Sequence, residues 1–331
     1  MQKKAYDVIG FGDPFQDLVI RLSQLPPTNV NMHMDDYCFQ GGGNVSTAMV
    51  ASARLGLKSA LIGNVGDDLL GRMILSDLEY NGVDVAHVRV NSGCRSNFCL
   101  CMAEQVNQGK EFISKGGDFD PIQPEDLDEN FIKSARVLHV GNFTPAIIQA
   151  ARWMHEAGGA VSIDAAYYRP DIYENYRYID IFIASETYYN VMCKEEGITN
   201  KEDYEAVLRS IQAKGPDTVI VTFGPEGCRG VSGDRYFELP AFRVNAVDST
   251  GAGDVFHGAY VYAWLQGWEA EKSCRFCSAV SAIKCTRMGG RSGIPTLPIL
   301  EKFLEEGVID GEELDARVQH YKYGLMNLWN L

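Results

Sequence analysis

Short apolar runs that alternate with helical patterns are the feature of this sequence that most constrains its fold. Strands are expected at residues 6–12, 59–65, 137–140, 160–164, 179–184, 218–223 and 242–247. Helices are expected at residues 44–55, 69–80, 146–156, 204–213, 254–266 and 269–287. Apolar strands separated by amphipathic helices are typical of a parallel sheet covered on both faces. The sequence therefore predicts a doubly wound α/β domain.

Two stretches, residues 18–40 and 95–114, interrupt this alternation because they carry strand-like segments with no helix between them. Candidate strands lie at residues 31–39, 96–104 and 111–114, and Asn-Gln-Gly-Lys at 107–110 is a turn signal. We expect a small separate sheet built from two insertions, at about 13–40 and 93–116. Such a sheet, exposed on one face, would be a lid or a dimer contact. A surface hairpin without a role is the alternative.

The whole chain, residues 1–331, is therefore interpreted as one domain with a lid. The last twenty residues are expected to form a terminal helix whose apolar residues are Leu325, Leu328, Trp329 and Leu331. No apolar run approaches the roughly 20 residues that span a bilayer, and the first residues lack the apolar core of a signal peptide. Neither a membrane segment nor an export signal is expected.

Charge and cysteine content exclude further classes of protein. With 30 basic and 44 acidic residues the formal net charge is −14, which repels the phosphate backbone of nucleic acids. One small anion in a local pocket is still compatible with that charge, because nearby dipoles set the local field. The nine cysteines are scattered, and we expect reduced core thiols in a cytoplasmic protein. Cys274 and Cys277 have zinc-like spacing but no second pair of ligands.

The segment Asp-Ser-Thr-Gly-Ala-Gly-Asp at 248–254 carries the strongest chemical signal, and an apolar helix follows it. Gly251, Ala252 and Gly253 leave the first N–H groups of that helix bare. Those groups and the helix dipole suit a phosphate or a developing phosphoryl charge. Asp254, in the first turn, is expected to accept a proton from a substrate hydroxyl beside that cradle. The alternative is a helix cap and a plain chain turn.

Three weaker segments follow other predicted strands. Gln-Gly-Gly-Gly-Asn at 40–44 opens a helix, and the bare backbone with the amide of Asn44 suits a polyol, although a glycine hinge with an Asn cap is the alternative. Asp17 lies beyond the first strand, at the edge where doubly wound sheets bind ligands, but an isolated Asp is more often a turn residue. Thr-Phe-Gly-Pro-Glu-Gly at 222–227 suits a nucleotide, although a plain turn is the alternative.

Taken together and in order, these segments resemble the ribokinase-like, pfkB-type carbohydrate kinases over about residues 6–298. Residues 42–44 and 63–71 resemble the N-terminal signature of that family, and residues 248–254 resemble its C-terminal signature. The resemblance implies a three-layer αβα Rossmann-like domain with a β-sheet lid. It also implies ATP-dependent transfer of the γ-phosphate to a hydroxyl, expected to be primary, of a small sugar. The short glycine signature and residues 284–295 look most like the ketohexokinase and sulfofructose kinase-like branch, which favours a ketohexose or a derivative.

The resemblance assigns roles to individual residues. The catalytic base would be Asp254, and the anion hole would be Gly251, Ala252 and Gly253. Contacts with the sugar are implied for Asp17, Gly42, Gly43 and Asn44, and contacts with an anionic group for Lys110 and Arg169, although a structural salt bridge is the alternative for Arg169. The ATP site would include Thr222, Gly224, Gly227 and Ser278. A monovalent cation such as K⁺ would bind at Asp248 and Thr250.

One departure from the family pattern concerns Mg²⁺. Many members carry Asn-x-x-Glu after the strand expected at 179–184, where this chain has Ser185, Glu186 and, at the usual Glu position, Tyr188. Glu186 is the remaining carboxylate for Mg²⁺, acting through water. A nucleoside or vitamin kinase of the same fold and a non-catalytic sugar-binding homologue stay as alternative functions. A homodimer through the lid is expected, with no nucleic-acid or membrane partner.

Overall fold

The computed structural model describes residues 4–24, 29, 31–104 and 110–323. The strands of the large sheet are β1 (Val8–Phe11), β4 (Ser59–Gly66), β5 (Val83–Asn91), β8 (Val137–Val140), β9 (Ala160–Ala165), β10 (Ile181–Ser185), β11 (Thr218–Thr222), β12 (Cys228–Ser232) and β13 (Arg235–Leu239). The strands of the small sheet are β2 (Phe15–Leu22), β3 (Asp36–Gly42), β6 (Phe98–Glu104) and β7 (Lys110–Lys115). The helices are α1 (Asn44–Arg54), α2 (Leu69–Tyr80), α3 (Glu129–Lys133), α4 (Pro145–Glu156), α5 (Pro170–Tyr173), α6 (Glu186–Glu195), α7 (Tyr204–Gln212), α8 (Ala252–Leu265), α9 (Ala270–Cys285), α10 (Leu297–Glu306) and α11 (Glu312–Tyr323).

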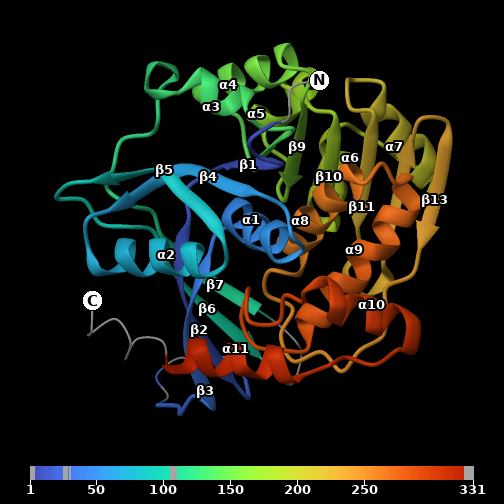
Figure 1. The fold of residues 1–331 in the computed structure, drawn as a ribbon. Helices are drawn as coiled ribbons and strands as arrows, with labels where there is room; N and C mark the ends of the chain where they lie inside the picture. Colours follow the sequence, from blue (N-terminus) through green and yellow to red (C-terminus); the bar gives the residue numbers. More distant parts are fainter. Residues whose placement is uncertain (1–3, 25–28, 30, 105–109, 324–331) are drawn as a thin grey trace.

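The large sheet has the order β13-β12-β11-β10-β9-β8-β1-β4-β5 and lies between two layers of helices (Figure 1). One hydrophobic core packs α1, α8 and α9 on one face, and a second core packs α4, α6 and α7 on the other. Every residue of β1, β4, β8 and β9 is buried, because both faces of these strands are covered. The predicted α/β class with three layers is confirmed.

β1 lies between β4 and β8, and both pairs are parallel. The chain leaves β1 towards β4 on one side and later returns to β8 on the other, so the strand order reverses at this point. In doubly wound sheets, ligands bind at the carboxyl ends of the strands where the order reverses. The fold therefore directs the functional site to the ends of β1 and β8.

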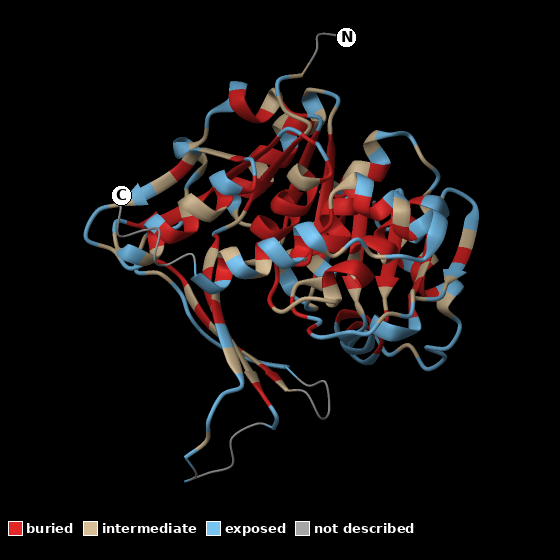
Figure 2. Cartoon of the chain, turned by 60° about the horizontal axis from the view of Figure 1, so that its bottom comes forward, coloured by how far each residue is buried: buried red, intermediate tan, exposed pale blue. Residues whose placement is uncertain are grey.

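The small sheet has the order β3-β2-β6-β7 and projects from the body (Figure 2). Its strands come from the two segments in which the sequence predicted a lid. Strand alternation gives this sheet two different faces. One face carries Asp17, Cys99 and Cys101, which are buried, together with Lys110, which reaches the body. The other face carries apolar side chains that point away from these residues.

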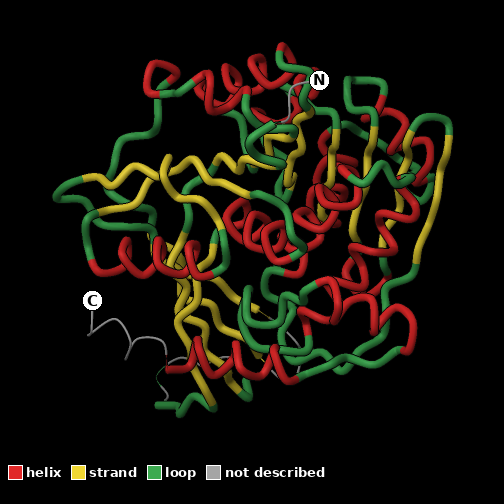
Figure 3. Tube along the Cα trace, in the orientation of Figure 1, coloured by secondary structure: helices red, strands yellow, loops and turns green. Residues whose placement is uncertain are grey.

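Three expectations about the elements differ from the structure. The sheet is not wholly parallel, because β12 and β13 extend it as an antiparallel hairpin that turns at Gly233, whose φ is 53°. Residues 242–247, expected to be a strand, run as a loop into the site (Figure 3). The terminal helix is described as α11, and its expected residues Leu325, Leu328, Trp329 and Leu331 lie outside the described residues. Among the helices described, none is long and apolar enough to cross a membrane.

Candidate active site

The N-terminus of α8 forms an open cradle of backbone N–H groups. Gly251 caps this helix with a φ of 73°, a left-handed conformation that disfavours any side chain. A Cβ added to Gly253 would meet no atom within 4 Å, so the space beside the first turn is open. Gly251 and Gly253 therefore leave N–H groups at the start of the helix accessible to an anion. The N–H of Ala252, predicted to join them, instead donates to the carbonyl oxygen of Ser249 at 3.2 Å.

Asp248 holds the loop that leads into this cradle. Its carboxylate accepts the N–H of Thr250 at 2.8 Å and the N–H of Gly289 at 2.7 Å. The ammonium of Lys284, a fully buried side chain of α9, donates to the carbonyl oxygen of Asp248 at 2.9 Å. Burial lowers the pKa of Lys284, and the negative charge of Asp248 opposes that shift. Lys284 therefore places a cation beneath the loop. The sequence analysis assigned no role to this residue.

Asp254 lies in the first turn of α8, beside the cradle. Burial, followed by the negative charge of Asp164, raises the pKa of its carboxyl to about 6. The positive charges of His257, Lys110 and Lys284 act in the opposite direction. A carboxylate with a pKa of about 6 is deprotonated at neutral pH and is a stronger base than an exposed Asp, which suits proton abstraction.

Asp164, at the end of β9, connects Asp254 to the glycine segment. Its carboxylate accepts Nδ2 of Asn44 at 3.2 Å and lies 3.2 Å from Nε2 of His257. Burial disfavours the ionised form of Asp164, but the neighbouring His257 and these hydrogen bonds outweigh it and lower the pKa. Asn44 begins α1 and His257 lies in α8, so one buried carboxylate fixes both helices. The sequence analysis missed His257 and gave Asp164 no role.

A second buried histidine supports this pair. His139 on β8 lies 3.3 Å from the hydroxyl of Ser162, and its ring centroid is 5.5 Å from that of His257. Burial lowers the pKa of His139 to about 3, and the charge of His257 adds to that shift. His139 is therefore neutral at neutral pH and packs beside His257 as an uncharged ring.

Asp17 and Gly42 meet at the base of the lid. A Cβ on Gly42 would come closer than 3.0 Å to the carboxylate of Asp17, so any side chain there would displace that carboxylate. Burial raises the pKa of Asp17 to about 7, and the nearby guanidinium of Arg291 opposes that shift. Gly43 caps α1 with a φ of 87°, which places Asn44 directly beyond this contact. The predicted sugar residues are thus brought together on neighbouring elements.

Arg291 is a further residue that the sequence analysis missed. Its fully buried guanidinium donates to the carbonyl oxygen of Gly42 at 3.0 Å and forms an ion pair with Asp77 of α2. Arg317 of α11 donates in turn to the carbonyl oxygen of Arg291 at 3.0 Å. The C-terminal helix therefore supports the glycine segment through two arginines.

Three of the predicted ATP residues lie at the end of β11 and in the turn after it, and the fourth, Ser278, lies on α9. Thr222 ends β11 opposite Ser185 of β10, and its hydroxyl donates to the carbonyl oxygen of Ala184 at 3.3 Å. Gly224 has a φ of 52° and open space where a side chain would be. Gly227 has a clear structural role, because a Cβ there would come closer than 3.0 Å to the end of β13. Cys228 directly follows Gly227, and Ser278 of α9 lies within hydrogen-bonding reach of Cys228.

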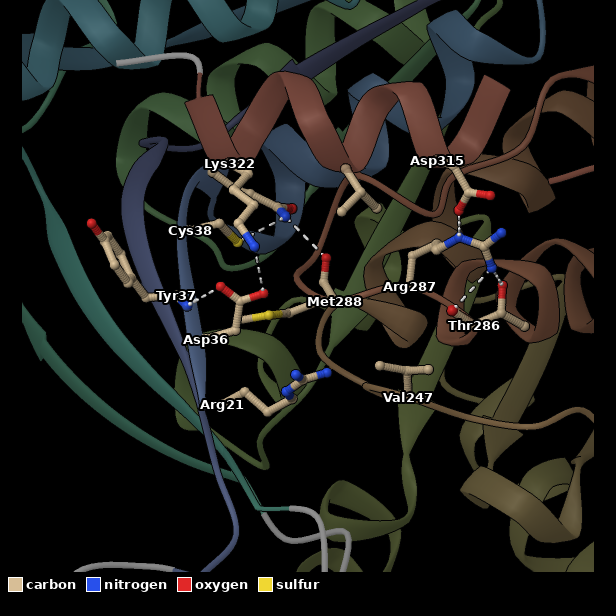
Figure 4. A pocket seen from close by; sticks show the side chains of 12 residues that line it. Arg21, Asp36, Tyr37, Cys38, Val247, Thr286, Arg287, Met288, Asp315 and Lys322 are labelled. Atoms are coloured by element: carbon tan, nitrogen blue, oxygen red, sulfur yellow. Dashed lines mark hydrogen bonds and ion pairs between the residues drawn. The ribbon is translucent and has the colours of Figure 1, made fainter. Parts of the chain in front are cut away.

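A cavity of about 200 Å³ lies between β3, α11 and the segment around Met288 (Figure 4). Lys322 pairs with Asp36 across it at 3.3 Å, and Arg287 pairs with Asp315 at 2.7 Å. None of the predicted site residues lines this cavity. Its lining includes Val247, which directly precedes Asp248, and Gln40 at the start of the glycine segment.

Comparison with known proteins agrees with this geometry. The model of the pfkB family carbohydrate kinases matches residues 7–297. This chain belongs to the pfkB family. As a pfkB-family member it is a carbohydrate kinase, a phosphotransferase with an alcohol group as acceptor.

The relatives of this pfkB-family kinase are named for several different substrates. An ATP-dependent ribose-1-phosphate kinase of Halopiger xanaduensis is 28% identical over 302 residues, covering 90% of this chain and 98% of that protein. A fructokinase-1 of Zea mays is 28% identical over 327 residues, covering 89% and 98%. The structure of a ribokinase from Thermotoga maritima superposes with a TM-score of 0.79 at 22% identity, covering 91% of this chain and all of that one. This last likeness shows the fold, including the lid.

The surroundings of Tyr188, Glu186 and Arg169 in this pfkB-family kinase bear on their expected roles. Tyr188, at the position of the usual Glu, is fully buried, and its hydroxyl lies 2.6 Å from that of Tyr176, so it belongs to the core. Glu186 is exposed at the start of α6. Arg169 is half-exposed, and its guanidinium pairs with Asp171 at 2.9 Å. The salt bridge that the sequence analysis offered as the alternative for Arg169 is therefore present.

Proposed function

We propose that this pfkB-family kinase transfers the γ-phosphate of ATP to a primary hydroxyl of a small sugar, a ketohexose or a derivative of one. The arrangement of Asp254 carries the proposal. Its carboxylate has a pKa raised to about 6 and stands in the first turn of a helix whose N–H groups are open to an anion. A base and an anion cradle side by side are what phosphoryl transfer to an alcohol requires.

The sugar would lie between the lid and the start of α1. The carboxylate of Asp17 can accept hydrogen bonds from two hydroxyls, and Gly42 and Gly43 let the sugar approach the backbone. Asn44 donates one N–H to Asp164, which leaves its carbonyl oxygen and second N–H for the substrate. Lys110, and Arg169 if it leaves Asp171, would meet an anionic group. The buried contacts of Asp164 and Arg291 keep this surface in place.

Phosphoryl transfer would then use groups already in position. The hydroxyl of the sugar attacks the γ-phosphorus as its proton passes to Asp254, and the bond from phosphorus to the bridging oxygen of ADP breaks. Charge that develops on the transferred group meets the N–H groups of Gly251 and Gly253, and that of Ala252 once it leaves the carbonyl oxygen of Ser249. The ammonium groups of Lys110 and Lys284 add positive charge from two sides. Because the chemistry is mostly positioning and charge stabilisation, one modest base suffices.

The nucleotide would lie across Thr222, Gly224 and Gly227, with Ser278 beside the adenine. Mg²⁺ would neutralise the phosphates of ATP, and the exposed carboxylate of Glu186, next to the end of β11, fits a role in holding it through water. A monovalent cation at Asp248 and Thr250 also stays a proposal. That cation would share the loop with the ammonium of Lys284. An activity assay in which tetramethylammonium replaces K⁺ measures whether the monovalent cation is needed.

A dimer through the outer face of the lid is a further part of the proposal. Leu18, Phe39, Leu100 and Ile113 face one another in register across the four strands, and the side chain of Ile113 is 61% exposed. Apolar side chains in a continuous row on an exposed sheet favour association with a second copy. Sedimentation of the wild-type chain and of Ile113→Glu measures this.

A substrate screen tests the proposed function. ADP release is measured with ketoses, aldoses, sugar acids, sugar phosphates, sulfonated and amino-linked sugars, nucleosides and pyridoxal at saturating ATP and Mg²⁺. We expect the highest kcat/KM with a ketohexose or one of its derivatives. Turnover confined to nucleosides or pyridoxal would replace the proposal with the alternative of a nucleoside or vitamin kinase. Binding of sugars without any ADP release would indicate a non-catalytic homologue.

A further inference from the structure

Two thiols and a carboxylate meet on the inner face of the lid. The Sγ atoms of Cys99 and Cys101 on β6 lie 3.6 Å apart. Asp17 of β2 stands opposite Cys99 in the register of the two strands, and its carboxylate is within hydrogen-bonding reach of the thiol of Cys101. One ligand atom from each of the three residues lies within 4.8 Å of the other two. All three side chains are buried.

This spacing matches the ligand set of a tetrahedral metal ion. With Zn–S bonds of about 2.3 Å, two sulfurs on one tetrahedral ion stand about 3.8 Å apart, close to the separation of Cys99 and Cys101. Two sulfurs and one carboxylate oxygen are donors that Zn²⁺ accepts, whereas Mg²⁺ requires oxygen ligands. Three protein ligands leave a fourth position for water. Among the residues that the structure describes, no other group of His, Cys, Asp and Glu has this spacing.

We propose that Asp17, Cys99 and Cys101 bind Zn²⁺, and that the bound ion competes with the sugar. On binding, both thiols lose their protons to solvent, so the two thiolates and the carboxylate give the occupied site a net charge of −1. The guanidinium of Arg291 lies close enough to Asp17 to offset that charge. Asp17 and Cys99 each keep 8% of their surface exposed, so the proposed ligands lie just beneath the surface of the lid. The competition follows because Asp17 cannot serve the ion and the sugar at once.

Cys38 provides a matched control on the same lid face. It lies on β3 opposite Val19 and packs in the same small cluster as Cys99 and Cys101. Its thiol accepts a hydrogen bond from Nε2 of Gln40 at 3.3 Å, and it does not belong to the group with metal-ligand spacing. Cys38→Ser therefore removes one buried thiol from this face without removing a proposed ligand.

Direct binding is measured on the metal-free full-length protein in a non-thiol reductant, without ATP or sugar. Co²⁺ is the probe, because thiolate ligands give it an intense charge-transfer absorption, and Zn²⁺ is then added to displace it. We expect one equivalent of Co²⁺ to bind with this absorption, retained in Cys38→Ser and abolished in the double variant C99S/C101S. The proposal is overturned if wild type lacks the absorption, or if the double variant keeps it while circular dichroism confirms that it is folded.

Competition is measured separately, on the kinase with the sugar found in the substrate screen. Zn²⁺ should raise the apparent KM for the sugar at unchanged kcat, and C99S/C101S should need at least tenfold more Zn²⁺ for the same effect. An effect on kcat alone would overturn the competitive part of the proposal. If the screen finds no sugar substrate, the proposed function fails, but the cobalt titration still decides the metal site by itself.

Discussion

The ammonium of Lys110, on the lid strand β7, lies 3.5 Å from the carbonyl oxygen of Ser249, two residues before the cap of α8. The lid thus touches the loop that forms the anion cradle, although the two segments are 139 residues apart in the sequence. The positive charge of Lys110 also acts on Asp254. The proposed closure of the lid over the sugar would therefore be linked to assembly of the charged site.

Lys110→Met is expected to lower kcat by roughly 10- to 100-fold, because a positive charge near the transferred phosphoryl group is lost. The same change removes a charge that lowers the pKa of Asp254, so the acid limb of the pH profile should move to higher pH. Steady-state kinetics over a range of pH measure both effects. Lys115→Met is the control, since Lys115 lies on the same strand but pairs with Asp118 at 3.2 Å. Equal losses in the two variants would contradict a specific role for Lys110.

The activity should depend on pH through Asp254. A general base must be deprotonated, so kcat/KM should fall as the pH drops through about 6, where burial and the charge of Asp164 place the pKa of this carboxyl. Asp164→Asn removes one of the charges that raise that pKa, so the acid limb of kcat should move to lower pH. KM should rise in the same variant, because the hydrogen bond of Asn44 loses its charged acceptor. An acid limb that stays in place, or moves to higher pH, would refute this assignment.

Two glycines of α8 are expected to differ in their tolerance of a methyl group. A Cβ at Gly258 would come closer than 3.0 Å to the carbonyl oxygen of Ala48 in α1, whereas a Cβ at Gly253 meets nothing within 4 Å. Gly258→Ala should therefore reduce the free energy of unfolding by about 1–3 kcal/mol through overpacking between the two helices. Gly253→Ala should leave it unchanged or raise it slightly, because Ala favours a helix. Chemical denaturation measures both variants, and equal stabilities would be inconsistent with this packing.

The sequence could predict the residues whose chemistry is carried by a local motif. Asp254, Gly251 and Gly253 lie within seven consecutive residues, and Asn44 directly follows its glycines. The role of each is visible in the neighbouring residues, because a helix start exposes N–H groups wherever it occurs. Local apolar periodicity likewise predicted α1, α2, α4, α7, α8 and α9 within two residues of their observed bounds, whereas α6 and α10 were not predicted.

Residues that act through distant contacts could not be found in this way. Arg291 donates to Gly42, which is 249 positions away, and nothing in the sequence around either residue indicates that contact. The one local indication of a functional role for Lys284 was the position of a lysine within an apolar stretch of α9. The strand predicted at residues 242–247 was wrong for a related reason. Phe242 and Val244 pack against the core without a neighbouring strand to pair with, so their apolar character was mistaken for that of a strand.

Asp254→Asn tests the central claim most directly. The variant keeps the size of the side chain but removes the base, so kcat for ADP release with the best sugar should fall by about 10²- to 10⁴-fold. Binding of that sugar, measured from the shift in thermal unfolding, should stay close to that of the wild type, because Asp17 and Asn44 are untouched. A folded Asp254→Asn variant with near-normal turnover would contradict the account.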